Sequence, residues 1–456
     1  AGMTYTWNNP TVSIEGASTV IGPHPYTVTA TGICGTTTAQ GTITVAGSRF
    51  SMTSMASDSI YIGVGFFGGL PLYVDWGDGT DTTYTTGGWK KHFFAGSTTP
   101  PYTVTGQART ITQLYCQSNK LTALDITGCP ALTGLRCDTN QLATLDVSLN
   151  TALTYLYCAN NQLTALDVSQ NTALISMDCG GNQLTALDVS QNTALTYLSC
   201  GGNQLRALDV SQNTLLGYLH CHSNQLTELD VTHNLKLSYL RCANNSLEDL
   251  DISANPDLTY LGCNGNPLTA LDVSANSKLT SLYCFSNQLT ALDLNNNTAL
   301  TTLNCGYNPL DTLDVSKNTA LTDLRCSNNQ LTALDVSKNT ALTALRCNNN
   351  QLSALDLSAN TKLDSVWCYY NQLTALDVTN NTALKRLRVQ TNQFDAAALN
   401  ALFGTLPAGA GEKKVYIYNN PRSNPGAGTG ASGCNRSIAT DKGWEVNDTI
   451  FMDQNE

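Results

Sequence analysis

Every twenty-first residue from Cys116 to Cys368 is a cysteine, which makes an unbroken series of thirteen. A fixed period of this length is typical of a solenoid, in which each repeat is one structural unit stacked on the next. The series therefore predicts a mostly β architecture of stacked coils. It does not identify a ligand, because function in such a protein depends on the residues that the coils place on their surface.

Each coil contains two short segments in which apolar and polar residues alternate. The coil over residues 153–173 reads LTYLYCANNQLTALDVSQNTA, and its apolar positions recur in most other coils. The period of two places Leu156 and Cys158 on one face of an extended segment and Tyr157 on the other. Residues 166–168 alternate in the same way. We therefore predict two extended legs per coil, each with an apolar inner face that is buried only when coils stack.

The repeat LxxLxCxxNxLxxLDVSxNxx resembles the leucine-rich repeat family. It is most similar to the 21-residue bacterial class that is common on surface proteins of Bacteroidota, with Cys in place of the second Leu of the LxL strand. The resemblance covers roughly residues 111–394. It implies a solenoid whose Leu-x-Cys segments form a parallel sheet on a concave face. It also implies an extracellular or cell-surface protein with a role in adhesion or recognition.

The residues outside the repeats predict additional β structure and a small helical element. The sequence YVDWGDGT, which begins at Tyr73, resembles the hairpin of the PKD family of β-sandwiches. Asp395 is expected to be the N-cap of a short helix that ends near Phe403. The expected parts are an immunoglobulin-like β fragment or appendage (1–47), a PKD-like β cap (48–112), the repeat solenoid (113–394) and a small α/β C-terminal cap (395–456).

Composition excludes some classes of partner. The chain of 456 residues has a net charge of −11, which argues against nucleic acid as a ligand. No apolar run is long enough to span a bilayer. The Asp of the Leu-Asp-Val leg recurs thirteen times from Asp125 to Asp377. We interpret it as a turn carboxylate that accepts nearby backbone N–H groups, in preference to a calcium ligand.

Cysteine and histidine offer no strong metal or catalytic site. The thirteen cysteines share one inward position, so buried free thiols are favoured over disulfides or a zinc ladder. His220 and His222 flank Cys221, but solvated histidines are favoured over a metal site because their predicted neighbours, Ser199 and Arg241, are poor ligands. GxSxG, P-loop, GxGxxG and HExxH motifs are absent from the sequence. We therefore expect no cofactor and no enzymatic activity.

Binding is expected where outward residues differ from coil to coil. Tyr197, Tyr218, Tyr239 and Tyr260 should align in a row, because they hold equivalent positions in four consecutive coils. Exposed aromatic and Arg side chains are typical of protein-binding hot spots, and aromatic faces can stack on sugars. Alternatively, the rings form a cross-strand ladder that only stabilises the sheet. The candidate binding residues are Tyr155, Tyr157, Tyr197, Tyr218, Tyr239, Tyr260, Tyr283, Phe285, Arg325, Arg346, Trp367 and Tyr369.

Three functions are compatible with this pattern. The favoured one is a surface protein that binds a macromolecular partner, protein or glycan, through its concave face. The second is a glycan-binding accessory protein of a polysaccharide-use system. The third is a structural spacer within a larger surface assembly.

Overall fold

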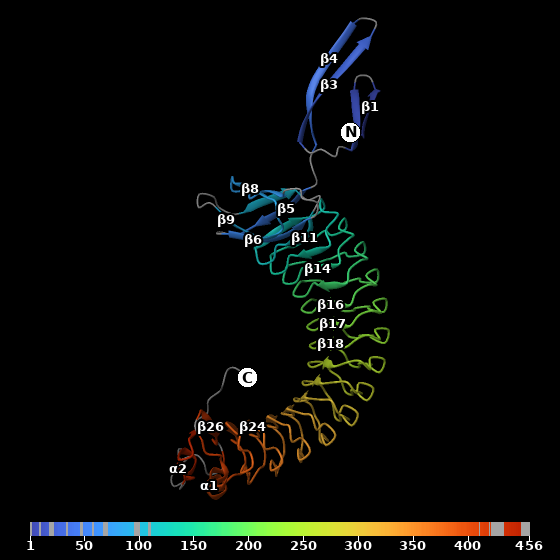
Figure 1. The fold of residues 1–456 in the computed structure, drawn as a ribbon. Helices are drawn as coiled ribbons and strands as arrows, with labels where there is room; N and C mark the ends of the chain where they lie inside the picture. Colours follow the sequence, from blue (N-terminus) through green and yellow to red (C-terminus); the bar gives the residue numbers. More distant parts are fainter. Residues whose placement is uncertain are drawn as a thin grey trace. The chain divides into compact units, whose positions relative to one another are not determined.

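The computed structural model describes most of the chain, which forms two compact units, Ala1–Ala173 and Leu174–Glu456 (Figure 1). We refer to them as the N-terminal and C-terminal units. No helix among the described residues is both long and apolar enough to cross a membrane. The described residues are 2–8, 11–17, 22–32 and 35–45, for which only the backbone is considered, and 49–56, 59–66, 72–94, 101–107, 111–409, 411–418, 420 and 433–447.

The N-terminal unit begins with two antiparallel strand pairs, β1–β2 and β3–β4. One sheet that follows has the order β12-β5-β10-β7-β8, and the other contains β9, β6, β11, β13 and β14 in that order. The strands are β1 (Gly2–Asn8), β2 (Thr11–Ala17), β3 (Gly22–Gly32), β4 (Gly35–Val45), β5 (Arg49–Ser54), β6 (Ser59–Phe66), β7 (Leu72–Asp75), β8 (Asp81–Tyr84), β9 (Gly88–Phe93), β10 (Tyr102–Gln107), β11 (Ile111–Tyr115), β12 (Leu121–Asp125), β13 (Gly134–Arg136) and β14 (Tyr155–Tyr157).

The first coil is paired with the strands that precede it. Strand β11 runs antiparallel to β6 on one side and parallel to β13 on the other, while β12 pairs with β5. The Ser54 hydroxyl donates to the backbone carbonyl of Asn119 at 2.7 Å, and the Asn119 side-chain oxygen accepts from the Tyr61 N–H at 2.7 Å. Strands β5 and β6 thus supply hydrogen-bond partners to Asn119, whereas the side-chain oxygen of the equivalent Asn161 accepts from the preceding coil.

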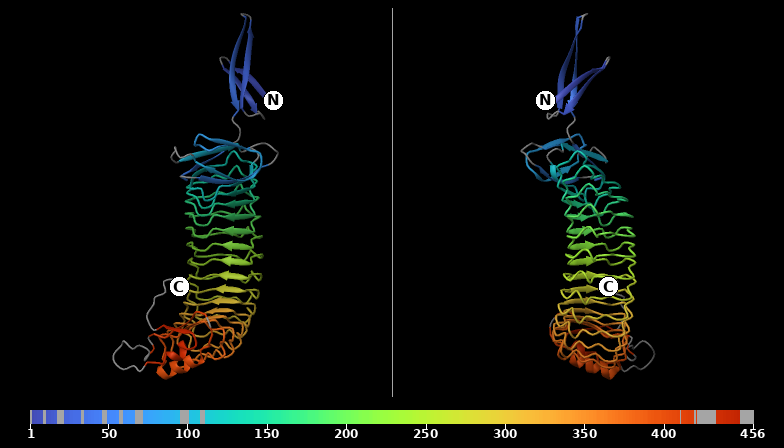
Figure 2. Two further views of the ribbon diagram at one scale, coloured as in Figure 1. Left: turned by 60° about the vertical axis from the view of Figure 1, so that its left-hand side comes forward. Right: turned by 90° about the vertical axis from the view of Figure 1, so that its right-hand side faces the viewer.

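The C-terminal unit confirms the predicted solenoid. Its short strands are parallel and pair in register, one strand to each repeat, and they stack along one side of the coils (Figure 2). The elements are β15 (Ser176–Asp178), β16 (Tyr197–Ser199), β17 (Tyr218–His220), β18 (Tyr239–Arg241), β19 (Tyr260–Gly262), β20 (Ser281–Tyr283), β21 (Thr302–Asn304), β22 (Asp323–Arg325), β23 (Ala344–Arg346), β24 (Ser365–Trp367), β25 (Arg386–Arg388), α1 (Ala396–Thr405), β26 (Lys413–Tyr416), α2 (Ser437–Thr440) and β27 (Trp444–Asn447).

The second predicted leg of each coil, the Leu-Asp-Val leg, has the expected apolar inner face, with Leu166 and Val168 buried and Asp167 exposed, but in the described coils after β12 it carries no strand. The reason is that few backbone groups of this leg pair with the preceding coil. The Gln162 N–H donates to the Leu142 carbonyl of that coil at 2.9 Å. The Asp167 carboxylate, however, accepts the Ser169 N–H of its own coil at 2.9 Å and closes a turn. The ladder is therefore confined to the Leu-x-Cys leg.

The same turns confirm the structural interpretation of the repeated Asp. The Asp188 carboxylate accepts the backbone N–H of Ser190 at 2.9 Å, and the equivalent Asp residues of the other coils do the same with their own second neighbours. Hydrogen bonds from Ser190, first from its backbone and then from its side chain, lower the pKa of Asp188. Each carboxylate thus stabilises the turn of its own coil.

The core consists of the inward Leu, Val and Cys positions. The thirteen ladder cysteines are fully buried and are free thiols, as predicted. Burial raises the pKa of Cys200 to about 12, because a thiolate would lose its hydration inside the coils. These thiols are consequently neutral at physiological pH.

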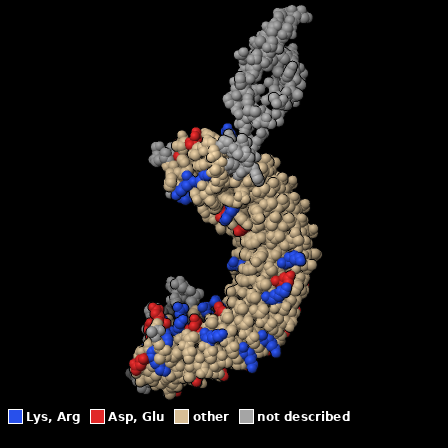
Figure 3. Space-filling view, in the orientation of Figure 1, with Lys and Arg blue, Asp and Glu red and all other residues tan. Residues whose placement is uncertain are grey.

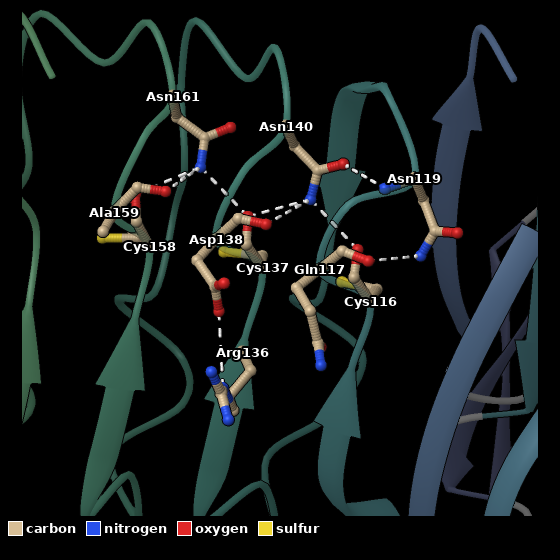
Figure 4. Close-up of polar contacts among 10 residues, drawn as sticks. All are labelled: Cys116, Gln117, Asn119, Arg136, Cys137, Asp138, Asn140, Cys158, Ala159 and Asn161. Atoms are coloured by element: carbon tan, nitrogen blue, oxygen red, sulfur yellow. Dashed lines mark hydrogen bonds and ion pairs between the residues drawn. The ribbon is translucent and has the colours of Figure 1, made fainter. Parts of the chain in front are cut away.

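Two columns of asparagine hold successive coils together. In the first, shown in Figure 4, the Asn161 amide donates to the carbonyls of Cys137 at 3.0 Å and Cys158 at 3.1 Å, and its oxygen accepts the Leu142 N–H at 2.9 Å. This column is formed by the Asn that stands three residues after each ladder Cys. A second, fully buried column was not predicted, and in it Asn171 donates to the preceding coil. Both columns satisfy carbonyls that would otherwise be buried unpaired.

The C-terminal end contains the predicted helix. The Asp395 carboxylate accepts the Ala398 N–H at 2.8 Å and caps α1, whose residues Leu399, Leu402 and Phe403 are buried. Strands β26 and β27 continue the parallel sheet beyond β25. The sheet of this unit therefore extends past the last regular repeat.

Candidate binding surface on the parallel sheet

Each three-residue strand of the C-terminal unit, from β15 to β25, has its first and third residues on the outward side of the sheet. In β17, Leu219 is fully buried, whereas Tyr218 is 46% exposed and His220 is half-buried. This follows from the period of two along a strand. Since the strands are in register, the first residues form one outward column and the third residues form a second column. In Figure 1 the strands of this unit line the inner side of its bend.

The four predicted tyrosines lie in the first column, where Tyr218, Tyr239 and Tyr260 stack in series and Tyr197 contacts Tyr218 in a tilted arrangement. Strand pairing aligns Tyr197, Tyr218, Tyr239 and Tyr260, which confirms the predicted row. Their ring centroids are 6.2, 5.5 and 4.1 Å apart along the series, and the last two rings are parallel within 1°. We call this set the tyrosine column.

Two residues of the second column join the tyrosine column. The His220 ring stacks on Tyr239 at 4.9 Å and lies 5.7 Å from Tyr197, while Tyr283 lies 5.5 Å from Tyr260. Burial, followed by the nearby charge of Arg241, lowers the pKa of His220. His220 is therefore part of a neutral aromatic surface.

Ring stacking determines which atoms the tyrosine column presents. Burial, followed by a hydrogen bond with Tyr239, raises the pKa of Tyr260 to about 12, so its hydroxyl stays protonated. Because the rings of Tyr218, Tyr239 and Tyr260 are stacked, a ligand would meet mainly ring edges and hydroxyl groups there. This geometry suits contacts with a protein surface better than face-to-face stacking on sugars.

A second group of residues lies toward the C-terminal end of the second column. Strand pairing places Arg346, Trp367 and Arg388 in consecutive coils, followed by Tyr416. The guanidinium carbons of Arg346 and Arg388 lie 3.8 and 4.4 Å from the Trp367 ring centroid, and Arg388 lies 4.9 Å from the Tyr416 ring. We call these four residues the arginine–tryptophan stack. Trp367 is only 8% exposed, so its face is not an open platform for a sugar.

Arg325 differs from the other arginines of this column. Its guanidinium forms a forked pair with the carboxylate of Asp323 on the same strand, with the closest contact at 2.7 Å. Phe285 and Tyr369, the remaining candidates of this unit, are half-buried and each follows a ladder cysteine in the turn beyond the strand. The structure therefore places these two candidates beside the outward columns rather than within them.

The N-terminal unit carries its own aromatic surface. Tyr155 is 46% exposed, and Tyr157 lies 5.4 Å from the Arg136 guanidinium. On the adjacent strands Trp89 stacks on Tyr61 at 4.9 Å and lies 5.8 Å from Tyr115. Gly63 of strand β6 leaves room for these rings because it has no side chain. A Cβ at this position would lie only 3.1 Å from both Trp89 and Tyr115.

Sequence reasoning missed several of these residues. Arg388 lies one full repeat after Trp367 and could have been found by continuing the period, but Val389 stands where a ladder cysteine would have marked the coil. Tyr416 is displaced from the period because α1 lies between β25 and β26. Trp89 and Tyr61 reach the sheet only through the β6–β9 pairing, which has no local signal in the sequence.

Comparisons with known proteins agree with this architecture. A family model described as the LVIVD repeat matches residues 153–178. No curated protein matches the chain.

Solved structures match the repeats at greater length. The functional domain of InlJ from Listeria monocytogenes, which includes a cysteine ladder, is 38% identical, with 67% of this chain and 74% of that chain covered and a TM-score of 0.60. YopM, a leucine-rich effector protein from Yersinia pestis, is 27% identical, with 58% and 74% covered and a TM-score of 0.51. The internalin InlF from Listeria monocytogenes is 24% identical, with 62% and 86% covered and a TM-score of 0.54, and it supports the fold alone.

Proposed function

The chain belongs to the bacterial-type leucine-rich repeat proteins of the short-repeat class, and from this premise we propose that it binds a protein partner through the outward face of its parallel sheet. The proposal includes a location outside the cell or on its surface, and a role in adhesion or recognition. Residues 48–112 and 395–456 act as caps of the repeat array in this account.

The observation that carries the proposal is the tyrosine column. Four consecutive coils place Tyr at the same outward position, although nothing in the packing of the buried Leu and Cys residues requires it. Tyr supplies a large amphipathic contact area at a low cost in conformational entropy. A rigid, preformed row of such side chains limits the ordering cost of binding.

The experiment is a binding screen of the intact chain against surface proteins and a panel of polysaccharides. Beside it we would test a variant with Tyr197→Ser, Tyr218→Ser and Tyr239→Ser. The matched control replaces Tyr307 and Tyr370, which are 61% and 47% exposed in turns outside the columns, with Ser. We expect a protein ligand whose binding is lost in the column variant and retained in the control.

Other outcomes would favour the competing functions. Binding of a polysaccharide alone would favour the glycan-binding accessory role. Equal binding of the ligand by the intact chain and by the column variant would show that the tyrosine column takes no part in recognition. Failure of the intact chain to bind anything would favour a structural spacer, in which the stacked rings only stabilise the sheet.

A further inference from the structure

The arginine–tryptophan stack borders a cationic hollow in a chain that is acidic as a whole. The hollow measures about 690 Å³, and five of the 23 Lys and Arg residues of the chain line it together with two carboxylates. Figure 3 shows Lys and Arg gathered over these C-terminal coils. Two other hollows of the same unit are lined by two and by six carboxylates, and neither has a cationic side chain in its lining. The cationic residues of the first hollow are Arg346, Lys385, Arg386, Arg388 and Lys414, and the acidic ones are Asp364 and Glu412.

Lys385 departs from the repeat at a position that has a structural role in other coils. In earlier coils this position is Thr, as at Thr343, whose hydroxyl donates to the Thr322 carbonyl of the preceding coil at 3.0 Å. The backbone N–H of Lys385 still donates to the Asp364 carbonyl of its preceding coil at 2.8 Å, but its side chain is exposed. The coil thus has an exposed positive charge in place of a side-chain hydrogen bond, and the packing of the buried residues does not require this exchange.

Arg386 and Lys414 place two positive charges opposite each other on neighbouring strands. Strand pairing sets Arg386 of β25 against Lys414 of β26, which continues the first outward column. Lys414 has the Glu445 carboxylate at 3.5 Å. Neither Arg386 nor Lys385 forms an ion pair within the part of the chain that the structure describes. Like charges directly opposite each other destabilise a sheet, so an anion bound between them would offset their repulsion.

The rest of the lining suits a polar ligand. Among the described residues that line the hollow none is aliphatic, whereas the centre of a protein interface is normally apolar and depleted of charge. Ser365, Tyr416 and the two carboxylates supply donors and acceptors for hydroxyl groups. The volume of about 690 Å³ lies within the range of small-molecule sites and can hold part of an oligosaccharide.

We propose that this hollow binds a polysaccharide that carries sulfate or uronate groups, with the anionic groups at Lys385, Arg386 and Lys414. A linear polyanion presents charges at intervals along its length, as the neighbouring strands present these cations. Exposed cationic side chains act mainly through their charge, so we expect binding to weaken as salt is added. This second ligand site goes beyond the proposed function and does not depend on the tyrosine column.

The test measures the binding of fluorescein-labelled dextran sulfate to the intact chain by fluorescence anisotropy. Labelled neutral dextran and labelled poly-L-glutamate are measured in parallel. In the hollow variant, Lys385→Gln, Arg386→Gln and Lys414→Gln remove three positive charges from the lining. We expect this variant to bind dextran sulfate at least about tenfold more weakly than the intact chain does.

Two further variants separate local charge from net charge and from side-chain shape. The charge-matched control, Lys317→Gln, Lys338→Gln and Lys362→Gln, removes three exposed charges from turns outside the hollow. Its affinity for dextran sulfate should stay within about twofold of the intact chain. Arg386→Lys keeps the charge and loses only the guanidinium, and it should also bind within about twofold.

Four results would overturn the inference. The first is an intact chain that does not bind dextran sulfate at low salt. The second is equal binding of neutral dextran, which would remove the anionic groups from recognition. The third is a charge-matched control that loses as much affinity as the hollow variant, which would reduce the effect to net charge. The fourth is tighter binding of poly-L-glutamate than of dextran sulfate, which would assign the hollow to an acidic protein segment. Thermal unfolding of each variant verifies that the fold is retained.

The outcome is separable from that of the proposed function. The tyrosine column lies on β16 to β19, whereas the strand residues that line the hollow lie on β23 to β26. The tyrosine column variant should therefore bind dextran sulfate as the intact chain does. A chain that binds the probe but shows no dependence of partner binding on the tyrosine column would refute the proposed function alone. A chain that loses its partner with the tyrosines but ignores the probe would refute this inference alone.

Discussion

The buried and the outward residues of a strand follow opposite rules in the C-terminal unit. The middle residues of β17 and β18 are Leu219 and Leu240, and both are fully buried. The residues that follow them, His220 and Arg241, have different chemistry although strand pairing places them side by side. Buried positions repeat because each coil must fit the next, whereas outward positions contact solvent and can differ without altering the backbone. Stability is thus concentrated inside the coils, and the sheet face is free to carry the residues that the proposed recognition role requires.

Alkaline pH should have the largest effect on the buried side. The pKa of Cys200, Cys242, Cys305 and Cys368 is raised by burial to about 12 from 9.0. The folded chain keeps these protons while the unfolded chain releases them, so this stability is present below about pH 9 and is lost as pH rises toward 12. Each such thiol should contribute about 1.4 kcal/mol per pH unit to the loss in that window.

Urea unfolding at a series of pH values measures this loss. The variant with Cys200→Ala and Cys242→Ala removes two of the titrating thiols and should show a shallower decline above pH 9. A decline of equal slope in the variant would contradict the assignment of the pH dependence to the buried thiols.

The second-largest loss of stability is expected when a buried leucine is truncated. Leu240→Ala removes a fully buried side chain between two coils and should lower the free energy of unfolding by about 2–5 kcal/mol. Arg241→Ala, at the next residue but exposed, is the matched control and should change it by less than about 0.5 kcal/mol. Equal urea midpoints for the two variants would break the division between buried and outward positions.

The buried asparagine column should have a smaller but clear effect. Asn213 donates to the carbonyls of Val189 at 3.0 Å and Asn192 at 2.9 Å in the preceding coil. Asn213→Ala leaves both carbonyls without these donors and should lower the free energy of unfolding by about 1–3 kcal/mol. Thermal or urea unfolding tests this, and an unchanged midpoint would show that the column does not hold the coils together.

The smallest effect on stability is expected on the sheet face. Tyr239→Phe keeps the ring stacked on Tyr260 at 4.1 Å and removes only the hydroxyl. We expect a change of no more than about 1 kcal/mol in the free energy of unfolding, together with weaker binding of the partner. Loss of stability as large as that of Leu240→Ala would instead make the tyrosine column a structural ladder.

The sequence predicts the repeating part of this molecule well, because the same residue pattern recurs in every coil and each coil adopts the same backbone geometry. The cysteine period predicted the solenoid, the Leu-x-Cys alternation predicted the parallel strands, and equal spacing predicted that Tyr218 would align with Tyr239. Alternation also predicted the buried face of the second leg, but it cannot reveal whether the backbone groups of that leg pair with the next coil or, as at Asp167, close a turn.

The candidate surface was predicted less completely than the fold. Spacing identified Arg346 and Trp367, but the position of both arginines over one ring depends on side-chain conformations that spacing does not fix. The fork between Asp323 and Arg325 depends on side-chain conformations too, because residues two apart on a strand share a face but meet only in matching rotamers. Trp89 reaches the sheet through long-range strand pairing, which is absent from any local pattern.

The most direct test of the central claim is hydroxyl-radical footprinting of the chain with and without its partner. Tyr218, 46% exposed, reports on the sheet face, and Tyr307, 61% exposed in a turn, reports on the surface outside the columns. We predict that the partner protects Tyr218 from labelling and leaves Tyr307 unchanged. Protection of Tyr307 with full labelling of Tyr218 would show that recognition takes place away from the sheet face.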